Sequence, residues 1–221
     1  MILIKTQIQE EQKMNELLSG ILVGMPQGVE NLRLPDPNLR DYYRDEEERI
    51  FWLNCEVEVC AEDLIKMILR CNKEDKGIPI ESRKPIKIFI DSPGGDVIFM
   101  NSIISVMGIS KTPIYTINYC TAYSAASLIL AAGHKRYALP GSHVLLHNGY
   151  CSYSGEVGQV ESTKKYFDAL SKKTTDWLLG KTKIDSKTYK KKASKDWYLN
   201  EDEALENGII DKIVTDLDEI F

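Results

Sequence analysis

An uncharged run at residues 121–133 places the strongest constraint on how this chain can fold. It follows a β-branched and aromatic segment at 113–118, which predicts a strand. The small and aliphatic residues of the run, ended by Gly133, predict a short helix that is buried on all sides. Ser124 therefore lies at a strand-to-helix junction. The free N–H groups and the dipole of a helix N-terminus favour negative charge there.

Ser124 has two interpretations at such a junction. A nucleophilic serine requires an environment of this kind, because its attack on a carbonyl creates an oxyanion. A serine in front of a helix can equally serve only as the N-cap. The choice between these interpretations depends on other parts of the chain.

The rest of the chain alternates between strand and helix patterns, which predicts an α/β fold with helices packed on a parallel or mixed sheet. Residues 1–44 lack a sustained apolar period and are interpreted as an N-terminal arm. Residues 45–221 are interpreted as one domain. Strands are expected at 50–53, 86–90, 137–141, 143–147 and 209–214, and helices at 61–71, 97–107, 157–181, after Asp185 and after Asn200.

Composition narrows the functional class. A net charge of −5 argues against general nucleic-acid binding, and no uncharged stretch approaches the roughly 20 residues of a membrane span. Five cysteines without a C-x-x-C motif favour reduced thiols and a cytoplasmic location. Three histidines without H-E-x-x-H argue against a zinc site. No G-x-x-x-x-G-K-[ST] motif is present, so nucleotide use would belong to a partner.

A serine hydrolase would need a base, an acid and an oxyanion hole in addition to Ser124. His147 and His143 lie on the same face of the predicted 143–147 strand, and periodicity does not choose between them. Nor does it select the acid among 33 carboxylates. The Gly94-Gly95 turn allows close approach of a peptide and can donate N–H groups to an oxyanion, although a tight βα turn explains it equally well.

Four separate segments resemble the proteolytic subunits of Clp proteases, the ClpP serine peptidases, over about residues 45–216. They occur in the order and at the spacing of that family. These segments are Asp91-Ser92-Pro93-Gly94-Gly95, Ala122-Tyr123-Ser124-Ala125 with Leu130-Ala131-Ala132-Gly133, Leu139-Pro140-Gly141-Ser142 leading to Leu146-His147, and Asp196-Trp197-Tyr198-Leu199 with Asn207-Gly208-Ile209-Ile210-Asp211.

The resemblance implies a ClpP/crotonase-like α/β fold, with repeated β-β-α-type units in a head domain and a helical handle at about 148–184. It implies a serine endopeptidase that cleaves unfolded polypeptides without a cofactor or a metal. It also implies stacked homo-oligomeric rings, joined through the handles, and a Clp-type ATPase partner, with no nucleic-acid or membrane partner. The implied site comprises the nucleophile Ser124, the base His147, the acid Asp196, the oxyanion-hole amides of Gly95 and Ala125, and substrate contacts at Gly94, Gly95 and Gly149.

Departures from the family pattern leave alternatives open. The sequence around Ser124 is more similar to ClpP-type enzymes of phage and prophage, which include prohead maturation proteases. Residues 1–44 do not match the usual axial-loop sequence, which weakens the expectation of an ATPase partner. A catalytically silent ring subunit is a further alternative. An enoyl-CoA hydratase-type enzyme is disfavoured, because that family lacks a Ser-His pair at these positions.

Overall fold

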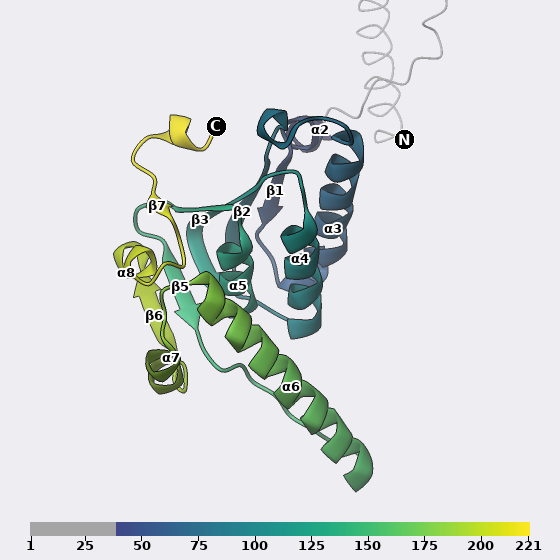
Figure 1. Ribbon diagram of the computed structural model, residues 1–221, viewed down its shortest axis with the longest axis vertical. Helices are drawn as coiled ribbons and strands as arrows, with labels where there is room; N and C mark the ends of the chain where they lie inside the picture. Colours follow the sequence, from purple (N-terminus) through teal and green to yellow (C-terminus); the bar gives the residue numbers. More distant parts are fainter. Residues whose placement is uncertain (1–38) are drawn as a thin grey trace, which may run out of the picture. The chain divides into compact units, whose positions relative to one another are not determined.

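The computed structural model describes residues 39–221, of which 42–221 form one compact unit (Figure 1). Residues 1–38 of the predicted arm lie outside the described part. The strands are β1 (Ile50–Leu53), β2 (Ile86–Ser92), β3 (Ile114–Tyr123), β4 (Lys135–Ala138), β5 (His143–Leu146), β6 (Trp197–Asn200) and β7 (Lys212–Ile213). The α-helices are α2 (Arg40–Glu48), α3 (Val57–Glu74), α4 (Val97–Ile109), α5 (Ala125–Ala132), α6 (Val157–Lys181), α7 (Ser186–Lys192) and α8 (Glu201–Glu206). Two short 3-10 helices are η2 (Ile80–Ser82) and η3 (Leu217–Glu219).

The strands form one mixed sheet in the order β1-β2-β3-β4-β7, all parallel to their neighbours. β5 pairs in parallel with β3, and β6 pairs antiparallel with β5. The predicted α/β class with a parallel or mixed sheet is therefore confirmed. The last strand is shorter than the 209–214 run predicted, with only Lys212 and Ile213 in the ladder.

β3 is the central strand and is longer than the predicted 113–118 segment. Its first half pairs with β4 and its second half, residues 121–123, pairs with β5. β2 pairs in parallel with the other side of β3, and the register shifts between Ile90 and Ser92. The extension was missed because Cys120 is exposed and its neighbours are only partly buried, so no apolar pattern marks it.

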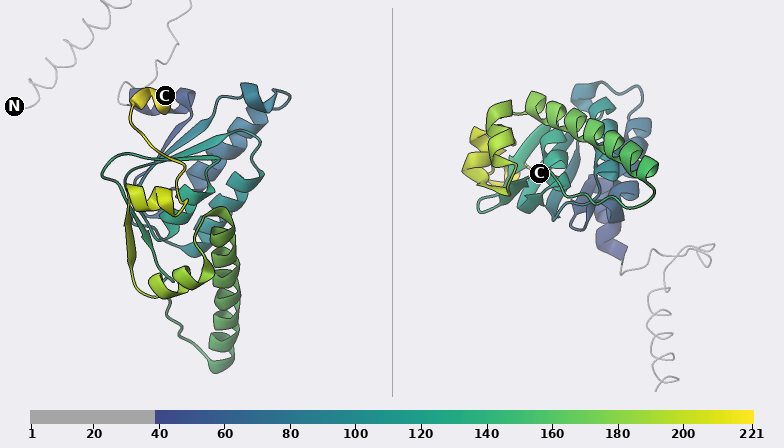
Figure 2. Two further views of the ribbon diagram at one scale, coloured as in Figure 1. Left: turned by 60° about the vertical axis from the view of Figure 1, so that its left-hand side comes forward. Right: turned by 90° about the horizontal axis from the view of Figure 1, so that it is seen from below.

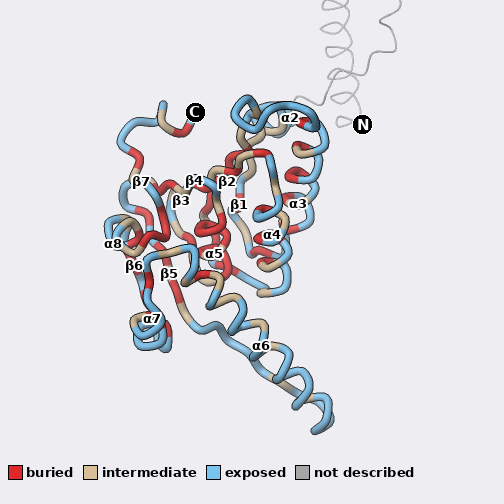
Figure 3. Tube along the Cα trace, in the orientation of Figure 1, coloured by how far each residue is buried: buried red, intermediate tan, exposed pale blue. Residues whose placement is uncertain are grey.

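Helices α3, α4 and α5 pack together over one face of the sheet (Figures 1 and 2). Seven of the eight residues of α5 are buried, which agrees with the predicted buried helix (Figure 3). A smaller apolar cluster covers part of the opposite face. It consists of Phe89, Ile117, Tyr137, Val214 and Ile220.

α6 differs from the other long helices because it projects from the sheet (Figures 1 and 2). Only Leu178, near its C-terminal end, is fully buried, and it joins the core beside α5. The predicted helix at 157–181 is therefore present, but most of its surface is open to solvent (Figure 3). Residues 147–156 lead to it without forming a strand.

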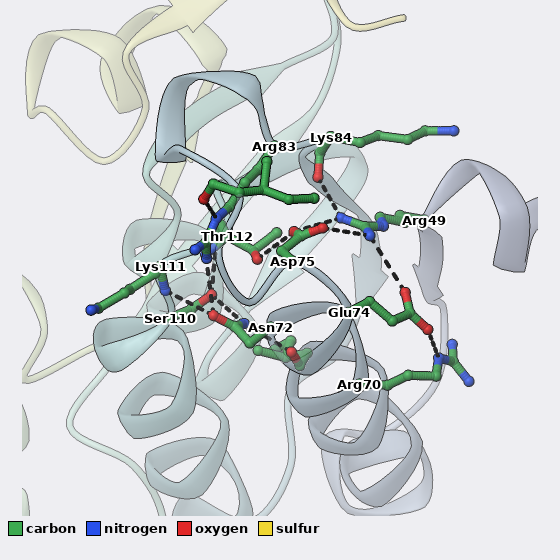
Figure 4. Close-up of polar contacts among 12 residues, drawn as sticks. Arg49, Arg70, Asn72, Glu74, Asp75, Arg83, Lys84, Ser110, Lys111 and Thr112 are labelled. Carbon is green, nitrogen blue, oxygen red and sulfur yellow. Dashed lines mark hydrogen bonds and ion pairs between the residues drawn. The ribbon is translucent and has the colours of Figure 1, made fainter.

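A polar network fastens the amino ends of β1 and β3 to the C-terminal end of α3 (Figure 4). Arg49 donates two hydrogen bonds to the Asp75 carboxylate, at 2.8 and 2.9 Å, and Thr112 donates a third at 2.7 Å. Asn72 Oδ1 accepts from the backbone N–H groups of Lys111 and Thr112. The hydrogen bonds from Arg49 lower the pKa of the Asp75 carboxyl against the opposing effect of burial. This end of the sheet is held by a desolvated ion pair.

Candidate active site

Four chain segments that carry predicted site residues meet at the carboxyl ends of β2, β3 and β5, at the other end of these strands from the Arg49–Asp75 network. β2 leads into the 92–96 loop, β3 leads directly to Ser124, and β5 leads directly to His147. Asp196 immediately precedes the antiparallel strand β6. Carboxyl ends of neighbouring parallel strands share one edge, so the topology explains why residues distant in sequence converge here.

Ser124 has a strained backbone, with φ 52° and ψ −120°. Such a conformation in a non-glycine residue persists only where the surroundings enforce it, and it is typical of serine nucleophiles on strand-to-helix turns. The Ser124 N–H donates to the Leu145 carbonyl at 2.9 Å, and its carbonyl accepts from the Ser127 N–H at 3.0 Å. Ser124 occupies the N-cap position of α5, but its hydroxyl makes no capping hydrogen bond. The side chain is thus available for another partner.

That partner is His147, whose Nε2 lies 2.6 Å from Ser124 Oγ. Both residues are partly buried. His143, the alternative that periodicity left open, is exposed and lies opposite Asn200 in the β5–β6 ladder. Only one of the two histidines on the strand is therefore in hydrogen-bond contact with the serine.

The other ring nitrogen of His147 accepts a hydrogen bond from the Gly149 N–H, at 3.2 Å from Nδ1. This contact matches the tautomer that carries its proton on Nε2. In this tautomer Nε2 donates to Ser124 Oγ. A general base must instead accept the serine proton at Nε2, with Nδ1–H donated to an orienting group. The single chain therefore holds the serine and the imidazole in contact, while the Gly149 N–H occupies the ring nitrogen that would have to donate to an orienting group.

Asp196 is exposed, and within residues 39–221 its carboxylate forms no hydrogen bond or ion pair. The β-ladder nevertheless relates it to the base. In the β5–β6 pairing, Leu146 lies opposite Trp197, so His147 and Asp196 are the next pair of that register. Directly opposed residues project on the same side of a sheet, with Cβ atoms about 5 Å apart where the ladder continues. The Asn148 N–H also donates to Ala193 O at 2.9 Å, which keeps the two segments together.

The 92–96 loop is fixed by the start of α3. Gly94 donates its N–H to Ser92 Oγ at 3.2 Å, and Gly94 O accepts from the Val57 N–H at 2.9 Å. The Asp96 N–H donates to Glu58 Oε2, also at 2.9 Å. Among the described residues, the N–H of Gly95 between them has no acceptor. The loop thus leaves one N–H group open and exposed, which is the arrangement that an oxyanion-hole donor requires.

Both loop glycines are sterically required. Gly94 has φ +102°, and a Cβ there would lie 2.7 Å from Tyr123 O and 2.8 Å from Ser124 Cβ. Gly95 has φ +145°, and its Cβ would lie 2.1 Å from Glu58 Oε2. The turn therefore packs directly against the backbone that strains Ser124. This contact distinguishes it from an ordinary βα turn.

Ala125 supplies the second amide at this position. It is the first residue of α5, so its N–H lacks an intrahelical acceptor and lies at the positive end of the helix dipole. Across the described chain, no group of three or more histidine, cysteine or acidic residues could hold a metal ion. The chemistry available here is therefore that of a hydroxyl, an imidazole and two backbone amides.

Sequence reasoning missed the residues that hold the 92–96 loop. Ser92 belonged to a recognised motif but had no assigned role, and Glu58 lies in a helix that was predicted to begin only at residue 61. A longer predicted helix would have placed Glu58 in its first turn, but no pattern would have indicated its contact with Asp96.

Comparison with known proteins identifies the family. A sequence model of the Clp protease family matches residues 40–216, which is most of the chain. The chain belongs to the Clp protease family. It is also 35% identical, over 136 residues, to the ATP-dependent Clp protease proteolytic subunit 2 of Treponema denticola, in an alignment covering 61% of this chain and 68% of that protein. The protein is accordingly a serine-type peptidase, as the resemblance implied.

In the part of the chain that the structure describes, no helix is both long enough and apolar enough to cross a bilayer.

Proposed function

We propose that the protein is an endopeptidase whose catalytic triad is Ser124, His147 and Asp196. The main support for this proposal is the 2.6 Å contact between Ser124 Oγ and His147 Nε2. The positive φ of Ser124 also supports it. Ser124 attacks the scissile carbonyl while His147 accepts its proton and then returns it to the leaving amine. Asp196 stabilises the imidazolium, and water hydrolyses the acyl-enzyme.

The oxyanion is held by the N–H groups of Gly95 and Ala125. Each such donor contributes about 3 kcal/mol to transition-state stabilisation in comparable sites. An extended polypeptide pairs its backbone with the chain at Gly94 and Gly95 and with the segment that contains Gly149. The exposed Gly95 and residues 150–155, which form no helix or strand, are suited to this kind of recognition.

Activation in this proposal requires a change at Gly149. Its N–H occupies His147 Nδ1, the atom that must donate to Asp196. Release of the Gly149 N–H, followed by extension of the β5–β6 register by one pair, brings Asp196 to Nδ1 and reverses the tautomer. The two segments already lie side by side there, because the Asn148 N–H donates to Ala193 O, two residues away from its partner in the β5–β6 register.

Assembly is the proposed cause of that rearrangement. Residues 45–221 act as one peptidase domain, and α6 with residues 148–184 forms a handle that joins homo-oligomeric rings. The exposed length of α6 supports this, since a projecting helix with a partly apolar face needs a partner. The related Treponema protein is named as the proteolytic subunit of an ATP-dependent protease, which supports an ATPase partner here. Five free cysteines support a reducing, cytoplasmic location.

Two alternatives share the fold. A phage-type prohead maturation protease would use the same triad on capsid or scaffold proteins. A catalytically silent ring subunit would retain the displaced Asp196 in its assembled state. The exposed carboxylate of Asp196 in the single chain is the observation that keeps the second alternative in view.

Hydrolysis of a fluorogenic peptide by the assembled protein tests the proposal. Ser124→Ala is expected to lower kcat by at least about 10⁴-fold, and Asp196→Asn by about 10³–10⁴-fold, because the acid fixes the tautomer. Ser82→Ala changes an exposed serine of η2, away from both the site and α6, and should leave the rate within about twofold. Activity in Ser124→Ala equal to wild type would refute the assignment, and an unaffected Asp196→Asn would remove Asp196 from it.

A further inference from the structure

Cys55 and Cys60 lie at opposite ends of the first turn of α3, with their Sγ atoms 2.6 Å apart. Both are free thiols in the structure and both are half-buried. This separation is shorter than the van der Waals contact of two sulfur atoms, and Cys60 Sγ also lies 3.7 Å from the Glu56 carbonyl oxygen. A disulfide bond requires a separation of about 2.05 Å, so a small approach would join them.

The position of the pair explains the contact. Glu56 is the N-cap of α3, which places Cys55 at N′ and Cys60 at N4. These are the two positions whose side chains meet in a hydrophobic staple, the contact that fixes how the chain enters a helix. The two sulfurs are therefore brought together by the helix start itself, so bond formation would preserve the local fold.

The same helix start holds the 92–96 loop. The Ser92 hydroxyl donates to the Cys55 carbonyl at 2.5 Å, one residue before the N-cap. Between the two cysteines, the Val57 N–H donates to Gly94 O, and the Glu58 carboxylate accepts from the Asp96 N–H. Each of these three contacts comes from the segment that a Cys55–Cys60 bond would close. The state of the thiol pair is thus mechanically connected to the loop that carries the Gly95 N–H.

We propose that Cys55 and Cys60 form a reversible disulfide that locks the start of α3 against the 92–96 loop. The oxidant is a small disulfide of the glutathione type. Its significance for catalysis rests on the function proposed above, in which Gly95 donates to the oxyanion. A locked segment keeps that donor preorganised.

The exchange proceeds in two balanced steps. The Cys55 sulfur, as thiolate, attacks one sulfur of oxidised glutathione; the S–S bond of the oxidant breaks and one glutathione thiolate leaves. Cys60 then loses its proton and attacks the Cys55 sulfur, releasing the second glutathione. Two protein thiols and one glutathione disulfide become one protein disulfide and two glutathione thiols. Burial raises the pKa of the Cys60 thiol, and an exchange that begins at Cys60 gives the same products.

The test uses the full-length chain with Cys120→Ser and Cys151→Ser, because both of those thiols are exposed and would react independently. The protein is incubated with oxidised glutathione, alkylated, and mapped by peptide mass. The expected result is loss of both alkylatable thiols at Cys55 and Cys60, with a linked 55–60 peptide, and full recovery after reduction. Alkylation of both residues after oxidation, or a bond that includes Cys71, would overturn the proposal.

Hydrogen exchange measures the coupling to the loop. In the oxidised protein, amide exchange in peptides covering 92–96 is expected to slow by at least about threefold, because the segment that holds them no longer opens. Peptides from β6 should not change. Cys60→Ser and Cys55→Ser, each in the same background, should show no response to the oxidant. Unchanged exchange at 92–96 in protein with the bond formed would also overturn the proposal.

These readouts separate this inference from the proposed function. Neither thiol mapping nor exchange requires peptidase activity, and both are expected to give the same result in Ser124→Ala. A protein that forms the bond and slows its loop but hydrolyses no peptide would sustain the inference and count against the triad.

Discussion

α5 and α6 are neighbouring helices, but α5 is almost completely buried and α6 is mostly exposed. α5 has eight residues, seven of them buried, and its N-terminus carries the strained Ser124. α6 has twenty-five residues, one of them fully buried. The first is completed by contacts within the chain. In a single chain, most of the surface of α6 has nothing packed against it.

This difference explains why the candidate site is only partly assembled. The residues fixed by the core, Ser124 and the 92–96 loop, have the geometry that catalysis requires. His147 and Gly149, at the start of the segment that leads to α6, form a contact that occupies the ring nitrogen needed by an orienting acid. The proposed nucleophile, Ser124, is thus positioned by contacts within the chain, whereas the proposed base, His147, has a neighbour that assembly would have to displace.

Substitutions in the buried core and on the exposed helix α6 should differ in their effect on stability, and the largest difference is expected for ion pairs. Asp75, whose side chain is 4% exposed, is paired with Arg49 in the core, while Asp168 is paired with Lys164 on exposed α6. Asp75→Ala should lower the free energy of unfolding by about 3–5 kcal/mol, because it removes the buried partner of the Arg49 guanidinium and the acceptor of the Thr112 hydroxyl, leaving Arg49 only the longer contact with exposed Glu74 and a backbone carbonyl. Asp168→Ala should change it by less than about 0.5 kcal/mol. Urea denaturation of both variants measures the difference.

The pH dependence of stability provides the check on that ion pair. Because the pKa of Asp75 is lowered in the folded state, its contribution is fully present above the unfolded value of about 4 and is lost as pH falls through the folded value. Asp75→Ala should lack this loss on the acid side. If the variant and the wild type lost stability in parallel below pH 4, the ion pair would not be the source.

A somewhat smaller difference is expected for apolar side chains. Ile129 of α5 is completely buried, and Tyr166 of α6 is 56% exposed. Ile129→Ala should lower the free energy of unfolding by about 2–5 kcal/mol at any protein concentration. Tyr166→Ala should have almost no effect in dilute, dissociated protein and a larger effect where the chains assemble. Equal losses of stability for both variants in dissociated protein would contradict the description of α5 as buried and α6 as exposed.

The smallest stability difference is expected for two glycines. Gly94→Ala places a Cβ against the Ser124 turn at φ +102° and should lower the free energy of unfolding by about 1–3 kcal/mol. Gly180→Ala, in α6 with nothing near the new Cβ, should raise it by up to about 1 kcal/mol. Thermal unfolding distinguishes the signs. A stabilising Gly94→Ala would mean that the loop is not packed as described.

Sequence patterns predicted the well-packed region better than the open one. The uncharged run after a β-branched segment correctly indicated a strand, a turn at Ser124 and a buried helix. The helix expected after Asn200 is present, and Asn200 and Glu203 form its capping box. These features are local, since each depends on residues only a few positions apart.

The remaining features depend on contacts between distant segments. Neither the positive φ of Ser124 nor the choice of His147 over His143 follows from periodicity, because both are set by the pairing of β3 with β5. The relation of Asp196 to His147 requires the register of β5 and β6. The interpretation of Asp196 as the acid came from family resemblance and stays a prediction.

Covalent labelling tests the central claim, an activated Ser124, most directly. The assembled protein is treated with a fluorophosphonate and its intact mass is measured, alongside Ser124→Ala. The account predicts one adduct per chain on the wild type and none on the variant, because only a serine with a proton-accepting base reacts in this way. A folded, oligomeric wild type that acquires no adduct, or a Ser124→Ala variant that is labelled equally, would contradict it.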